Sequence, residues 1–139
     1  MTLNWITLAA IFVGGGAGSV ARATLGAGIN RWADGGFSVI ENNIDSSLAP
    51  LGILLANVLA TGLLALLLIY GGEKWGRDSI WMPLLAVGFC GGFSTFSTFS
   101  IDTLRLFQEG NSSWAFANIA VSLIACLGVG WIIFKIWAK

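Results

Sequence analysis

The densest group of polar side chains in this sequence lies within an otherwise apolar stretch that reads GFCGGFSTFSTFS from Gly88 to Ser100. Serine and threonine hydroxyls compete with the backbone for hydrogen bonds, and glycine costs roughly 1 kcal/mol relative to alanine in a helix interior. A helix is therefore predicted to break here, leaving carbonyls for a hard cation and hydroxyls for a small anion. The alternative is a kinked helix whose hydroxyls bond back to its own carbonyls.

Three phenylalanines, Phe93, Phe96 and Phe99, are interspersed among these hydroxyls. Residues three apart share a broad face of a continuous helix. The positive edge of an aromatic ring can face an anion, whereas phenylalanine more commonly packs in a core or against lipid. Asp102 follows on the same stretch, where it indicates either a functional carboxylate or a local pair with Arg105.

Isolated polar side chains also occur in the other apolar stretches. Asn57 needs a hydrogen-bonding partner in hydrocarbon, which is either a neighbouring helix or a permeating ion. Asn118 and Ser122 lie one helical turn apart, and the hydroxyls of the third stretch are their expected partners. Arg22 is expected either to reach lipid headgroups or to line a vestibule that attracts anions.

Transmembrane helices must position these side chains. The chain has 139 residues, of which 56% are hydrophobic and only 10% are charged, too few to cover a soluble surface. In hydrocarbon each backbone polar group needs a partner within the protein, which favours helices. The sequence therefore predicts one all-α membrane domain over residues 1–139, with the third helix broken mid-membrane. The expected spans, of about 20 residues or more, are 3–23, 51–70, 80–107 and 114–137.

Charged residues and most tryptophans lie near the predicted span ends, as expected for a membrane interface. The connection 31–50 is polar and acidic. The two sides of the membrane differ little in basic residues, a weak bias that is compatible with insertion in both orientations. One side would hold Lys74, Arg77, Lys135 and Lys139, and the other would hold Arg31, Arg105 and, near a span end, Arg22.

Several functional classes are excluded by composition. The chain carries 7 basic and 7 acidic residues, so it has no basic surface for nucleic acid. It has no histidine, and no catalytic constellation is found, so an enzyme is not expected. The glycine-rich run from Gly14 to Ser19 lacks the strand that a dinucleotide loop requires, and it favours close helix packing instead. Cys90 and Cys126 are predicted to be free thiols.

The run GGFSTFSTFS resembles the signature of the Fluc (CrcB-type) fluoride ion channels. The resemblance covers the whole chain: a glycine-rich first span with Arg22 at its end, Asn57 in the second span, and Asp102 two residues after the run. It implies passive export of cytoplasmic fluoride across the cell (inner or plasma) membrane. It also implies an antiparallel, dual-topology homodimer with two pores.

The resemblance further implies roles for individual residues. Arg22 would sit toward a vestibule, and the backbone carbonyls of Gly91 and Ser94 from both subunits would hold a central structural Na⁺. Asn57 would bond the ion or orient the pore phenylalanines. The implied pore residues are Asn57, Phe96, Ser97, Thr98, Phe99, Asp102, Asn118 and Ser122.

Two other functions compete with a fluoride channel. Small multidrug or guanidinium exporters also have four short spans and dual topology, but their proton coupling needs a carboxylate that is usually in the first span. Residues 3–23 contain no aspartate or glutamate. A structural membrane subunit is the remaining alternative, and the interrupted third span argues against it.

Overall fold

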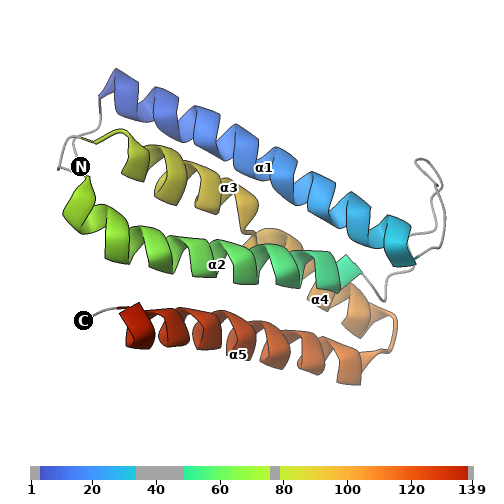
Figure 1. Ribbon diagram of the computed structural model, residues 1–139. Helices are drawn as coiled ribbons and strands as arrows, with labels where there is room; N and C mark the ends of the chain where they lie inside the picture. The colour runs from blue at the N-terminus through green and yellow to red at the C-terminus, as the bar shows by residue number, and fades with distance from the viewer. Residues whose placement is uncertain (1–3, 34–48, 76–78, 138–139) are drawn as a thin grey trace.

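The structure is a computed structural model that describes residues 4–33, 49–75 and 79–137. Within these residues all regular secondary structure is helical, as the sequence predicts. The predicted polar connection lies mostly at 34–48, outside the described residues. The helices are α1 (Trp5–Ala33), α2 (Ala49–Lys74), the π-helical η1 (Met82–Cys90), α3 (Gly91–Phe93), α4 (Phe96–Gln108) and α5 (Ser112–Trp137) (Figure 1).

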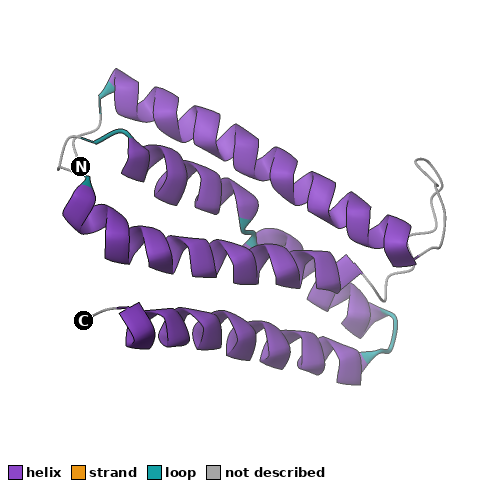
Figure 2. Cartoon of the chain, viewed as in Figure 1, coloured by secondary structure: helices purple, strands orange, loops and turns teal. Residues whose placement is uncertain are grey.

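Among the described residues, four segments are long and apolar enough to cross a membrane, which confirms the predicted number of spans. The third span runs through η1, α3 and α4, and Figure 2 shows the loop that interrupts it. Successive spans alternate in direction, so α1 begins at the same end of the bundle at which α5 ends (Figure 1). The chain is therefore a multi-pass membrane protein. The four segments are Trp5–Ile29, Pro50–Gly71, Met82–Gln108 and Ser112–Trp137.

The first helix is longer than the sequence predicts, since α1 continues past Ala23 to Ala33. The prediction counted apolar residues, whereas a helix can continue through small and polar residues once it has emerged from the most apolar region. Gly26 and Gly28 both lie within α1 without ending it. As a consequence, Arg22 lies inside the helix and not at its end.

Glycines let α1 approach the third span closely. A Cβ at Gly14 would meet the carbonyl oxygen of Leu84, and a Cβ at Gly18 would meet the carbonyl oxygen of Phe89. Small residues at helix interfaces allow this kind of backbone contact in membranes, where van der Waals packing drives association. The close approach agrees with the packing face predicted for the first span, and it fixes the position of α1 against η1 and α3.

Gly18→Ala is expected to lower the stability of the protein by roughly 1–3 kcal/mol, because overpacking forces the backbones apart. Gly16→Ala is the matched control, since a Cβ there meets nothing within 4 Å. Thermal unfolding in detergent, followed by tryptophan fluorescence, should show a lower midpoint for Gly18→Ala alone. Equal midpoints for the two variants would contradict the packing described here.

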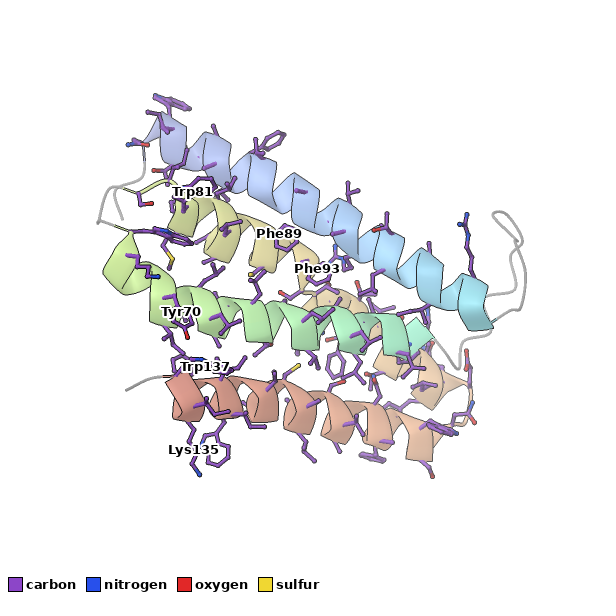
Figure 3. The ribbon with its side chains drawn as sticks, in the orientation of Figure 1. Tyr70, Trp81, Phe89, Phe93, Lys135 and Trp137 are labelled. Atoms are coloured by element: carbon purple, nitrogen blue, oxygen red, sulfur yellow. The ribbon has the colours of Figure 1, made fainter. Side chains whose placement is uncertain are left out.

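Aromatic side chains mark one end of the bundle. Tyr70, Trp81 and Trp137 gather at the end where α1 begins (Figure 3). The ring centroids of Trp75 and Trp81 are 6.4 Å apart. Amphipathic rings of this kind are enriched at the level of lipid headgroups. This end of the bundle therefore has the composition of a membrane interface.

Candidate functional site

The third span is broken at Ser94 and Thr95, which have extended backbone between α3 and α4. The break lies within the predicted stretch Gly88 to Ser100, at the start of its hydroxyl run, because Gly91 and Gly92 are still helical. Gly92 serves a different purpose: a Cβ there would meet the carbonyl oxygen of Gly15 on α1. Gly92 therefore permits helix contact, whereas a Cβ at Gly91 would meet nothing within 4 Å, and the backbone changes direction just after the pair.

The side chain of Asn57 on α2 replaces helical hydrogen bonds at the break. Its Oδ1 accepts from the backbone N–H of Thr95 at 2.7 Å, and its Nδ2 donates to the Thr95 carbonyl at 3.2 Å. In a continuous helix that N–H would bond to the carbonyl of Gly91. The Gly91 carbonyl thus loses its helical partner, and Asn57 joins α2 to the third span, which was one of its two predicted roles.

The hydroxyl of Thr95 begins the next helix. It accepts from the backbone N–H of Thr98 at 3.3 Å and lies 3.1 Å from the hydroxyl oxygens of both Ser97 and Thr98. Threonine is a preferred residue at a helix N-cap, and this preference is the sequence signal by which Thr95 could have been identified. The result is a cluster of three hydroxyls at the start of α4.

Two side chains of α1 reach the carbonyls at the end of α3. Arg22 Nη1 donates to the Ser94 carbonyl at 3.1 Å, and Ser19 Oγ donates to the Gly92 carbonyl at 3.5 Å. The sequence predicts neither contact. Arg22 was expected at a span end, and Ser19 was expected only to allow close helix packing. The guanidinium group lies beside the break in the third span.

The break separates Phe93, at the end of α3, from Phe96 and Phe99, which both lie on α4. Phe93 is buried and stacks on Phe89, with ring centroids 5.6 Å apart (Figure 3). Phe96 is 78% exposed and pairs with Phe99, with centroids 5.7 Å apart and planes tilted by 39°. Phe93 thus belongs to the core, whereas packing within the chain does not account for Phe96.

Of the two α5 side chains predicted to bond hydroxyls of the third span, Asn118 does so, whereas the Ser122 hydroxyl has no partner among the described residues. Asn118 Nδ2 donates to Thr103 Oγ1 at 2.8 Å, and this hydroxyl donates to the Phe99 carbonyl at 2.7 Å. Thr103 lies one turn after Phe99, which is the spacing at which a threonine can bond back to its own helix. Because the hydroxyl donates through its hydrogen, its oxygen lone pairs remain available to accept from the Asn118 amide.

Two buried polar atoms have no partner among the described residues: Oδ2 of Asp102 and Oγ of Ser122. Asp102 also forms no ion pair with Arg105 within the described part of the chain, although Arg105 follows one turn later. Burying a polar group without a hydrogen bond costs free energy, so each such atom requires an explanation. Water could donate to the Asp102 oxygen, whereas the Ser122 hydroxyl could donate either to water or to an anion.

The oxygen atoms at the break suit a hard cation. Within the described residues no group of three or more cysteine, aspartate or glutamate side chains could hold a metal ion. The Gly91 carbonyl lacks its helical partner, and the Ser94 carbonyl accepts one bond from Arg22 but has a second lone pair. Carbonyl ligands select hard cations over transition metals, so these two residues fit Na⁺ chemically.

Comparison with known proteins gives one consistent result. The family described as "CrcB-like protein, Camphor Resistance (CrcB)" matches residues 9–134. A protein of Enterobacter sp. (strain 638) named fluoride-specific ion channel FluC is 38% identical over 117 residues, which cover 84% of this chain and 82% of that protein. An Escherichia fergusonii protein named fluoride-specific ion channel FluC is 35% identical, over 94% of this chain and 93% of that protein. A Yersinia pestis protein named fluoride-specific ion channel FluC 1 is 33% identical, over 88% of this chain and 87% of that protein.

Proposed function

Because this chain belongs to the CrcB-like family, we propose that it is a passive fluoride channel that carries fluoride out of the cytoplasm across the cell membrane. It acts as a single four-span domain over residues 1–139. The broken third span is the observation that carries the proposal, since irregular backbone at membrane depth is tolerated where it is buried in protein or lines a cavity. Relatives named as fluoride-specific support the choice of ion, and the family match supports a transport protein rather than an enzyme.

The chemistry of fluoride matches the donors along the third and fourth spans. Fluoride is small and strongly hydrated, so the protein must replace its water along about 30 Å of hydrocarbon. Conduction needs binding that is favourable but weak, which hydroxyls, amides and ring edges provide better than full positive charges. Ser122 Oγ is without a partner among the described residues and could donate to the ion. The proposed pore residues are Asn57, Phe96, Ser97, Thr98, Phe99, Asp102, Asn118 and Ser122.

We further propose that two copies associate in antiparallel orientation and form two pores. Ser97 and Thr98 are exposed on the single chain, as is Phe96. Both hydroxyls lie 3.1 Å from the Thr95 hydroxyl, but each can form further hydrogen bonds, which lipid cannot provide and which a second copy and the aqueous pore beside it would supply. In this arrangement Phe96 and Phe99 border the pores, with one of these phenylalanines from each subunit facing each pore.

A structural Na⁺ is proposed at the dimer axis, held by the Gly91 and Ser94 carbonyls of both subunits. The Gly91 carbonyl supports this site, because it has lost its helical partner to Asn57 and lies on an exposed residue. When bound, the ion supplies positive charge between two anion pathways. Arg22 would border the vestibule at the same level of the bundle, which is consistent with its contact to Ser94.

The alternatives predict different transport. A proton-coupled exporter of the small multidrug or guanidinium type is not supported, because α1 carries no acidic residue that could couple transport to protons. Purified protein in vesicles separates the three functions: a channel passes fluoride down its gradient, an exporter requires coupling, and a structural subunit passes nothing.

Dual topology can be measured with Asn111→Cys. Asn111 is exposed in the turn between α4 and α5, whereas Cys90 is buried and Cys126 is partly buried within a span. An impermeant maleimide should label about half of the protein in intact cells and nearly all of it after permeabilisation, if both orientations insert equally. The parent protein, which lacks this thiol, is the control. Complete labelling, or none, in intact cells would rule out dual insertion.

A further inference from the structure

We propose that Arg22 is a positioning residue that, together with Asn57, holds the peptide group between Ser94 and Thr95 from two sides. Arg22 on α1 donates to the carbonyl of this peptide group at 3.1 Å. Asn57 on α2 accepts from its N–H at 2.7 Å. We refer to these two side chains and the peptide group between them as the peptide clamp. The peptide clamp itself does not depend on the proposed function, but its expected effect on fluoride flux rests on that function.

The planarity of the peptide bond explains why two contacts are effective. The carbonyl and the N–H of one trans peptide point in opposite directions and rotate together. A single hydrogen bond would leave this plane free to tilt, whereas bonds from α1 and α2 on its two sides fix its orientation. Because Ser94 and Thr95 have extended backbone, no helical hydrogen-bond pattern maintains this orientation. The two flanking helices must do so instead.

The position of Arg22 follows from the packing of α1. Gly18 lies one turn before Arg22 and contacts the backbone of Phe89 and Phe93, which fixes α1 over the end of α3. Ser19 reaches the Gly92 carbonyl from the same turn of α1. Arg22 is therefore held within reach of the next free carbonyl, that of Ser94, and its long side chain needs no movement of the backbone to bond it.

The positive charge of Arg22, like the reach of its side chain, suits the helix end beside the Ser94 carbonyl. The last carbonyls of a helix have no intrahelical partners and carry partial negative charge, which a nearby cationic side chain stabilises. η1 and α3 together form such a helix end at the break. A guanidinium at membrane depth also needs a partner of its own. The Ser94 carbonyl satisfies both requirements.

The clamp determines how α4 begins, and Phe96 is the first residue of α4. A tilt of the Ser94–Thr95 peptide would move the Thr95 hydroxyl, which caps α4, and with it the ring of Phe96. We therefore expect Arg22 to influence the pore through the clamp, in addition to any effect of its charge on anions in the vestibule.

Amide hydrogen exchange of the purified protein, read by mass spectrometry on peptides that cover residues 93–98, tests the clamp directly. Arg22→Met should accelerate exchange of the Thr95 amide by roughly tenfold, the effect of losing one charge-assisted hydrogen bond, although Arg22 does not touch that N–H. Arg22→Lys should restore part of the protection, since it keeps a charged donor. Arg31→Met, on the same helix, should leave these peptides unchanged.

Two results would overturn the clamp. One is unchanged exchange at residues 93–98 in Arg22→Met, and the other is equal acceleration along α5, which would indicate general loosening of the fold. If Arg22→Met does not yield a monodisperse protein, Arg22→Gln tests the same loss of charge, with accelerated local exchange again expected. Fluoride flux should follow the same order of variants. A parent protein that conducts no fluoride would refute the proposed function but leave the exchange result decisive for the clamp.

Discussion

Asn57→Asp is expected to reduce fluoride efflux by about a hundredfold or more. The carboxylate cannot donate the bond that Nδ2 now gives to the Thr95 carbonyl at 3.2 Å, so two acceptor oxygens would face each other there. It also places negative charge beside an anion path. Leaving a buried polar group unsatisfied costs roughly 1–3 kcal/mol, and each 1.4 kcal/mol on a barrier is about tenfold in rate. Initial rates from a fluoride electrode on protein-containing liposomes measure the effect.

Thr61→Val is the matched control for this substitution. Thr61 lies on α2 one turn after Asn57, and its hydroxyl donates to the Asn57 carbonyl within the helix at 2.8 Å. Valine keeps the size of the side chain and removes only the hydroxyl, so near-parent flux is expected. Size-exclusion profiles establish that both variants are folded. Parent-like flux in Asn57→Asp would mean that Asn57 neither orders the break nor borders the path.

Phe96→Ile and Phe99→Ile are each expected to lower fluoride flux by at least about tenfold. Each substitution removes a ring edge that the ion is proposed to pass, and a loss of about 1.4 kcal/mol, near the upper end for one aromatic interaction, lowers the rate about tenfold. Phe96 is 78% exposed on the chain, so its loss should barely change the fold of one subunit. Phe96→Tyr should be milder, since it keeps the aromatic ring.

Phe107→Ile controls for the loss of an aromatic ring on the same helix. Phe107 lies at the far end of α4 and packs edge-on against Phe116, with ring centroids 5.3 Å apart. Its substitution should leave flux close to that of the parent. Efflux rates and size-exclusion profiles are compared across the variants. If Phe96→Ile and Phe99→Ile both conduct like the parent, these phenylalanines are packing residues.

The architecture was predictable because it depends on properties that are local in sequence. The length of each apolar segment predicts four spans, and the density of glycine and hydroxyl residues predicts an interruption in the third. Both features depend on whether a segment can form hydrogen bonds to all of its own backbone N–H and C=O groups in lipid. The end of α1 was less predictable, because Ala33 lies beyond the apolar residues that the prediction counted.

The exact residues of the break within the predicted stretch could not be predicted, because its stabilising partners come from other helices. Asn57 on α2 and Arg22 on α1 bond the backbone of Thr95 and Ser94, which are far from both in sequence. Gly91 and Gly92, which helped to suggest the break, are both helical, and Gly92 allows close contact with α1. Thr103 was missed for a related reason: its role depends on Asn118, which reaches it from α5.

Passive fluoride efflux from vesicles that contain only this protein is the most direct measurement of the proposed function. Vesicles loaded with potassium fluoride or potassium chloride are diluted into medium without either anion, and valinomycin is added so that potassium can balance the charge. With no proton gradient and no partner protein, fluoride is expected to leave within the recording while chloride is retained. Fluoride release no faster than from protein-free vesicles, or equal release of chloride, would contradict a fluoride-specific channel.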